Sequence, residues 1–246
     1  MCCIEHDHHH HHHHHGIAAF FSVTFQCVEC IEKIAEVADE AFHLLGAFIE
    51  QYTDAVVFQT LSSLHDITHE VEHVLHAFCL GGDITRLIGG RFIVYHHDNQ
   101  HHHRIDYLRT LARVCHLAAH LLASLEFLNV QQICSLAGME RYFAYGNLFS
   151  ATGYAIWTIQ LVWNRFQENA DELSLTELFM QAGGFLFEAV QFINKVDPFN
   201  PYLLMLNPAA SIAGIIHASL VVHYLVPTIL LGVGAFFETP ENVGSH

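Results

Sequence analysis

The stretch PFNPYLLMLNPAASIAGIIHASLVVHYLVPTILLGVGAFF, residues 198–237, contains 40 residues without a single Asp, Glu, Lys or Arg. A helix of about 20 apolar residues is enough to cross the ~30 Å hydrocarbon layer of a membrane. Pro201, Pro208 and Pro227 interrupt the stretch, and residues 209–226 form its longest proline-free part. We therefore expect a helix embedded in a membrane here.

Residues 143–163 form a second uncharged segment, 21 residues long and bounded by Arg141 and Arg165. The segment is long enough for another span, and Trp163 at its end suits the interface between membrane and water. The alternative is that 143–163 and 209–237 are the central helices of a soluble bundle, apolar on all sides because they are buried. The sequence leaves both interpretations open.

Residues 166–196, between these two segments, are first polar and then amphipathic. They include Glu177 and Glu188, and we do not expect a full span there because charged groups are costly within a membrane. The C-terminal half is thus expected to hold about two to three hydrophobic helices.

The N-terminal half has the pattern of amphipathic helices. From residue 29 to 78 apolar residues recur every three to four positions, with charged residues on the other side. Residues 106–127 repeat this pattern, and Gly81-Gly82-Asp83 are expected to end the preceding helix. Because soluble helices bury their apolar side, we expect a compact bundle with this stripe packed inward. In the second helix the stripe consists of Ile67, Val71, Val74 and Phe78.

The composition agrees with a lipid-facing surface. Hydrophobic residues make up 52% of the chain and charged residues 14%, against roughly a quarter charged in average soluble domains. We therefore predict an all-α integral membrane protein with four regions. These are a disordered His-rich tail (1–16), an amphipathic helical region (17–141), a membrane-embedded helical region (142–238) and a C-terminal tail (239–246).

The charge balance excludes nucleic acid as a partner. The chain has 9 Lys and Arg against 25 Asp and Glu, a net charge of −16, and binding of phosphates needs a basic surface. The 7 cysteines have no disulfide spacing, and free thiols in a reducing compartment explain them best. No Lys or Arg precedes the first apolar run, so we expect no secretory signal peptide.

Residues 1–16 contain His6 and the run His8–His15. Such a tract cannot bury apolar surface and is expected to be disordered. An expression tag and a native tract both fit, and the residues 2–7 ahead of the run favour a native tract. A second His-rich stretch, residues 96–103, is expected to form an exposed polar loop.

The candidate site lies in the segment LHDITHEVEHVLH, residues 64–76. At about 100° per residue, five side chains fall on one side of a helix: His65, His69, Glu72, His73 and His76. Imidazoles one turn apart can share a Zn²⁺ or Ni²⁺ ion, and a Glu carboxylate can add an oxygen ligand. We predict a metal site at these five residues. The alternative is a solvated helix face that uses His in place of Lys or Gln.

Three further groups of residues are expected to be structural. His116 and His120 lie one turn apart beside two arginines, whose charges repel a dication. The lone CxxC at 27–30 has no second CxxC to complete a zinc site. His217 and His223 lie in the apolar C-terminal segment, where a neutral ring that hydrogen-bonds a neighbouring helix is expected.

No nucleophile, P-loop or dinucleotide motif indicates an enzyme. We expect a protein in contact with membrane lipid whose His-rich part, in an aqueous and reducing compartment, binds Zn²⁺ or Ni²⁺ for sequestration or sensing. The alternative is a membrane-anchored interaction or scaffold protein that packs against partner helices or itself, without a metal role. The His tract resembles His-rich metal carriers and cation transporters, and residues 198–237 resemble the hydrophobic hairpin of bacterial inclusion-membrane proteins.

Overall fold

A computed structural model describes residues 15–49, 55–88, 92–97, 103–166 and 175–237 of the chain. Its elements are α1 (His15–Ile49), α2 (Ala55–Ile88), β1 (Tyr95–His97), β2 (His103–Ile105), α3 (Tyr107–Val130), α4 (Glu140–Phe166), α5 (Leu175–Val196) and α6 (Leu203–Phe237). The protein is therefore all-α apart from one short hairpin. Residues 1–14 and 238–246 lie outside the described part of the chain. The prediction that the N-terminal tail is disordered falls on these residues and is therefore not tested.

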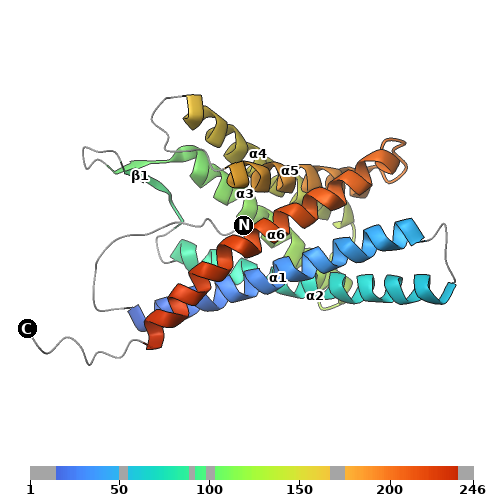
Figure 1. The fold of residues 1–246 in the computed structure, drawn as a ribbon, viewed down its shortest axis with the longest axis horizontal. Coiled ribbons are helices and arrows are strands. Elements are labelled where there is room, and N and C mark those ends of the chain that lie inside the picture. Colours follow the sequence, from blue (N-terminus) through green and yellow to red (C-terminus); the bar gives the residue numbers. More distant parts are fainter. Residues whose placement is uncertain (1–14, 50–54, 89–91, 98–102, 167–174, 238–246) are drawn as a thin grey trace, which may run out of the picture.

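The six helices form a closed ring (Figure 1). Each helix packs against the next one along the chain, and α6 also packs against α1. The chain runs back and forth, so the start of α1 and the end of α6 lie at the same end, where Gly232 lies against the Val23 side chain. The β1–β2 pair is also at this end, called the hairpin end below. The opposite end, where α1, α3 and α5 finish, is called the far end.

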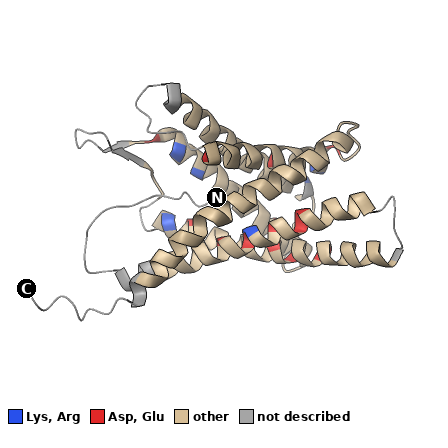
Figure 2. Cartoon of the chain, viewed as in Figure 1, with Lys and Arg blue, Asp and Glu red and all other residues tan. Residues whose placement is uncertain are grey.

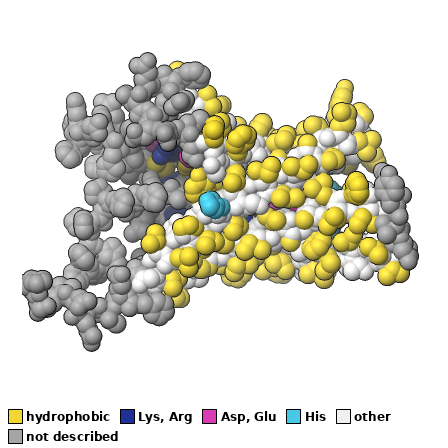
Figure 3. Space-filling model, viewed as in Figure 1, with side chains coloured by type: hydrophobic (Ala, Val, Ile, Leu, Met, Phe, Trp, Pro, Cys, Tyr) yellow, Lys and Arg dark blue, Asp and Glu magenta, His cyan; other side chains and the backbone are white. Residues whose placement is uncertain are grey.

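Most of the described acidic residues of α1 and α2 face inward, and many large apolar residues of the helices face outward; Asp66 and Glu70 of α2 are exceptions, since both are exposed. On α1, Glu32 is 2% exposed and Glu36 is 3% exposed, whereas Ile31 and Ile34 beside them are 53% and 54% exposed. Figure 2 shows acidic residues gathered midway along α1 and α2. Figure 3 shows one face of the molecule, on which hydrophobic side chains cover most of the described surface.

The prediction that the apolar stripe of the second helix packs inward is wrong. All four of its members are exposed: Ile67, Val71, Val74 and Phe78. The sequence period separates the two faces of a helix correctly, but it does not say which face is inside. In this ring the polar face is inside.

Two helices are long and apolar enough to cross a membrane by length and composition, α3 over 107–130 and α6 over 203–234. The second agrees with the expectation for 198–237. The segment 143–163 forms α4 as a helix, but α4 is not among the two, since uncharged polar residues such as Asn147 lower its mean hydropathy. Helix α3 was expected to be amphipathic and aqueous, and its length and composition are also compatible with a membrane span.

Helix α2 passes through Gly81 and Gly82, where the sequence predicts a break. The prediction is wrong because the two glycines give space to a neighbouring helix. A Cβ atom at either position would lie 3.3 Å from the ring of Phe25 on α1. The absence of a side chain here serves close helix packing and not a turn.

The His-rich stretch 96–103 is in part a β-hairpin. Tyr95 pairs with Ile105 and His97 with His103 in antiparallel register. Residues 98–102 lie outside the described part of the chain. The prediction of a polar loop is therefore wrong for the two ends of the stretch, which are strands.

Candidate functional site

The ring encloses a polar cavity of about 460 Å³, lined by residues of all six helices. The lining groups that bear charge or imidazole come mostly from α1 and α2, with His120 and Glu126 from α3 and Glu188 and Lys195 from α5. Asn147 and Asn207 add amides from α4 and α6. The His69 side chain lines the cavity and is 52% exposed, so solvent reaches the cavity.

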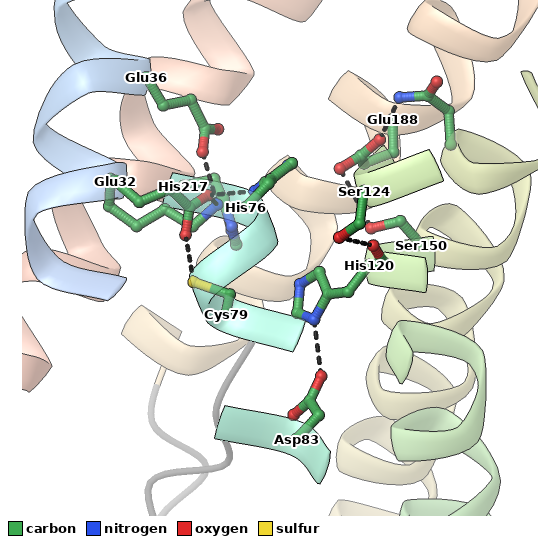
Figure 4. A network of polar contacts seen from close by, with 12 residues as sticks. Glu32, Glu36, His76, Cys79, Asp83, His120, Ser124, Ser150, Glu188 and His217 are labelled. Atoms are coloured by element: carbon green, nitrogen blue, oxygen red, sulfur yellow. Dashed lines mark hydrogen bonds and ion pairs between the residues drawn. The ribbon is translucent and has the colours of Figure 1, made fainter. Parts of the chain in front are cut away.

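A buried charged group forms the floor of the cavity. Lys33 Nζ lies 3.0 Å from Glu32 Oε1 and 2.6 Å from Glu36 Oε2. His76 Nδ1 of α2 lies 3.1 Å from the same Glu32 oxygen, and the Cys79 thiol donates to the other oxygen at 3.4 Å. Figure 4 shows Glu32 directed at both α2 residues. One lysine thus holds two carboxylates inside the ring.

Asp39 is the centre of a second group, nearer the far end. Its carboxylate is 4% exposed and lies 2.7 Å from His65 Nδ1 and 3.4 Å from His69 Nδ1. Thr68 donates its hydroxyl hydrogen to Asp39 Oδ1 at 3.0 Å. A carboxylate that faces Nδ1 of a neutral imidazole fixes the ring and leaves the Nε2 lone pair for a ligand.

His69 Nε2 lies 3.0 Å from His73 Nε2, one turn further along α2. Asp39, His69 and Glu72 also offer one ligand atom each within 4.8 Å of one another. Ligand atoms around a tetrahedral Zn²⁺ with bonds of 2.0–2.1 Å are about 3.3 Å apart. One nitrogen and two carboxylate oxygens, with His73 beside them, are therefore suited in type to a divalent transition metal. The spacing of up to 4.8 Å means that small side-chain movements would have to close the group around an ion.

The cavity carries more carboxylates than fixed positive charges. Among the described residues that line it, the Lys and Arg side chains are Lys33 and Lys195. Lys33 is paired as described, and Lys195 Nζ lies 2.8 Å from Glu126. The carboxylates that contact no Lys or Arg in the described part of the lining are Asp39, Glu40, Glu72 and Glu188. Buried carboxylates without a fixed counter-charge are costly unless they bind a cation or a proton.

Glu188 shows how the opposite wall of the cavity is built. It accepts hydrogen bonds from the Asn147 amide at 2.7 Å and from the Ser150 hydroxyl at 3.1 Å, both on α4. These neutral donors hold the carboxylate without cancelling its charge. The wall therefore adds to the negative charge of the cavity.

The structure divides the predicted metal residues into two groups. His65, His69, Glu72 and His73 lie around Asp39, whereas His76 belongs to the floor with Glu32. All five line the same cavity.

Asp39 was not predicted as a site residue because it was assigned to the solvent side of its helix. One signal was present in the sequence. Glu32, Glu36 and Asp39 recur at helical spacing in a chain that otherwise has few charges. In a membrane, the helix face that carries them should therefore point away from lipid.

The histidines expected to be structural are held by polar or ring contacts. His120 Nδ1 lies 2.6 Å from Asp83 Oδ2 of α2, as Figure 4 shows. His217 Nδ1 donates to the Met180 carbonyl at 2.8 Å, and its Nε2 lies 3.0 Å from the Tyr154 hydroxyl. The bond to Met180 joins α6 to α5, as expected for a neutral ring in an apolar helix.

The other residues that were expected to be structural, His116, His223 and the cysteines of the CxxC, differ in exposure. The His116 ring is buried against the Tyr154 ring at 4.7 Å, and His223 is exposed beside Tyr224. Cys27 and Cys30 are free thiols. No protein-family model, no curated protein and no solved structure matches the chain.

Proposed function

We propose that the chain is an integral membrane protein whose six helices enclose a binding site for one divalent transition-metal ion, Zn²⁺ or Ni²⁺. The apolar exterior supports this position, since charged residues in membrane helices face the interior of the bundle. Helices α1 and α2 then lie in the membrane together with α3 and α6, because the acidic residues of α1 are buried and Glu72 of α2 lines the cavity. Asp66 and Glu70 of α2 are exceptions, since both are exposed.

The observation that carries the proposal is the group formed by Asp39, His69 and Glu72, whose ligand atoms lie within 4.8 Å of one another. A dication there would offset two carboxylates that no Lys or Arg of the described residues contacts. Imidazole and carboxylate donors without a thiolate suit Zn²⁺ or Ni²⁺ better than Cu⁺. Binding of the ion within the membrane serves its sequestration or its sensing.

A matched pair of substitutions on α2 tests the site. Glu72 lines the cavity, whereas Glu70, two residues earlier, is exposed on the same helix. Zn²⁺ is titrated calorimetrically into the full chain in detergent, where the N-terminal His tract contributes equally to each variant. Glu72→Gln should weaken the cavity site at least about tenfold, and Glu70→Gln should leave its affinity unchanged.

Equal heats and stoichiometry for the two variants would contradict the proposal. The interaction or scaffold function would then take its place. One observation favours that second candidate: the exposed apolar stripe of α2, Ile67, Val71, Val74 and Phe78, is also suited to a partner helix in the membrane.

A further inference from the structure

The cavity lies in one half of the bundle. Its lining residues on α3 are 119–126, on α5 187–195 and on α6 207. Each of these ranges lies in the half of its helix that is nearer the far end. At 1.5 Å per residue, the lining residue Ala123 is about 10 Å from the end of α3 at Val130.

Buried apolar side chains pack together in the half of the bundle nearer the hairpin end. Cys30, Met180, Val221 and Leu225 form one buried apolar cluster there. Ala112, Trp157 and Leu161 form a second one between α3 and α4. The Asp83–His120 pair joins α2 to α3 between the cavity and the hairpin end. The half nearer the far end also holds a buried apolar cluster, Phe187, Val190, Leu203 and Ala210 of α5 and α6. The exposed lining side chains His43 (47%) and His69 (52%) nevertheless lie in this half of α1 and α2. Solvent therefore reaches the cavity in the half nearer the far end.

The basic residues are distributed unequally between the two ends. Those of the described elements at the hairpin end are Arg86, Arg104, Arg109, Arg113 and Arg165. Those at the far end are Arg141 and Lys195. Lys and Arg near the ends of membrane helices gather on the cytoplasmic side, whereas Asp and Glu have little influence. The fold makes this comparison of basic residues possible, because it shows which helix ends and loops lie at the same end of the bundle.

We infer that the hairpin end faces the cytoplasm and that the cavity receives its divalent cation from the opposite, non-cytoplasmic side. The inference rests on the proposed function for the identity of the cation, but the sidedness of the cavity can be tested separately. It departs from the expectation that the metal-binding histidines lie in a reducing compartment. The carboxylates of the cavity would attract cations to this side.

The test uses cysteine substitutions in the full chain and a membrane-impermeant maleimide. The maleimide must report only the introduced thiol, so four native cysteines are first replaced by Ser: Cys2, Cys3, the partly exposed Cys27, and Cys134, the described cysteine at the far end. Ala123→Cys then reports on the cavity, and Leu121→Cys, which is exposed on the outer side of the same helix, is its matched control. Ile105→Cys in β2 reports on the hairpin end. Right-side-out and inside-out membrane vesicles are compared.

Ala123→Cys should react in right-side-out vesicles only, and Ile105→Cys in inside-out vesicles only. Leu121→Cys should react several-fold more slowly than Ala123→Cys, because a thiol in contact with lipid forms little thiolate. The reverse pattern for Ala123→Cys and Ile105→Cys would overturn the sidedness. Equal reaction of Ala123→Cys from both sides would overturn access from one side only.

Labelling with and without Zn²⁺ distinguishes the proposal on the sidedness of the cavity from the proposal that the cavity binds metal. If the cavity binds the ion, added Zn²⁺ slows the reaction of Ala123→Cys several-fold. The labelling pattern without metal decides the sidedness whatever Zn²⁺ does, and the calorimetric titration of Glu72→Gln against Glu70→Gln decides the proposed function.

Discussion

Asp39 Oδ1 lies 2.7 Å from His65 Nδ1, a contact that joins α1 to α2 inside the ring. The same carboxylate lies 3.4 Å from His69 Nδ1. One buried carboxylate thus positions two imidazoles at the cavity, and it also belongs to the group of possible metal ligands. Metal affinity should therefore depend on Asp39 whether it touches the ion or only orients the rings.

Asp39→Asn should weaken Zn²⁺ binding by about 10- to 100-fold, the usual effect of removing a carboxylate that orients or binds at a metal site. Asp197→Asn is the control, since Asp197 is exposed beyond the end of α5. Competition with a zinc indicator measures both affinities. Identical affinities for the two variants would exclude Asp39 from the site.

Lys33→Met should destabilise the protein by about 3 kcal/mol or more, because it removes the buried ammonium group that contacts both Glu32 and Glu36. Lys195→Met removes the contact with Glu126, but the Lys195 side chain is 36% exposed, so its loss should cost about 1 kcal/mol or less. Unfolding of the detergent-solubilised variants by SDS measures the difference. Equal destabilisation by both substitutions would mean that the floor is not a buried ion group.

Val71→Asp tests which side of α2 meets lipid. The side chain is 43% exposed and faces outward, so the charge should hinder membrane insertion by about 3 kcal/mol. The fraction that is extracted and purified should melt in detergent close to the wild-type temperature, since no inner contact is lost. Val71→Leu is the control and should insert normally. A large loss of melting temperature for Val71→Asp would show that Val71 packs inside the bundle.

Gly153→Ala tests the close packing of α3 and α4. A Cβ atom at Gly153 would lie 2.6 Å from His116 Nε2, and the His116 ring is buried against Tyr154. The substitution should destabilise the protein by about 1–3 kcal/mol. Gly46→Ala in α1 meets no atom within 4 Å and should be neutral or stabilising, because Ala favours helix by up to about 1 kcal/mol. Thermal unfolding in detergent compares the two variants.

The helices were largely predictable because they depend on local patterns. The period of apolar residues indicated helices over 29–78 and 106–127, and Asp106 accepts a hydrogen bond from the Arg109 amide as the N-cap of α3. Period alone could not orient these helices. The amphipathic pattern at Ile34 and Glu36 is the same for a soluble bundle and for one surrounded by lipid, and only tertiary packing decides between them.

The site was predictable in part for the same reason. Residues on one helix, such as His69 and Glu72, could be placed together by spacing. Their contact with Asp39 joins positions 30 and 33 residues apart in the sequence, and it depends on how α1 meets α2. The prediction that the helix breaks at Gly81 was wrong for a related reason: the space left by the missing side chain is occupied by Phe25 of α1, a tertiary contact that the local sequence does not show.

The zinc content of the membrane-extracted protein tests directly whether the helical ring binds one metal ion within the membrane. A chain without residues 1–14 retains all of α1 and loses the His tract. It is extracted with detergent from membranes washed at alkaline pH, equilibrated with Zn²⁺, freed of excess metal and analysed by mass spectrometry of the element. We expect one Zn²⁺ per chain and none in the Asp39→Asn/Glu72→Gln double variant. Protein released by the alkaline wash, or equal zinc in both chains, would contradict this expectation.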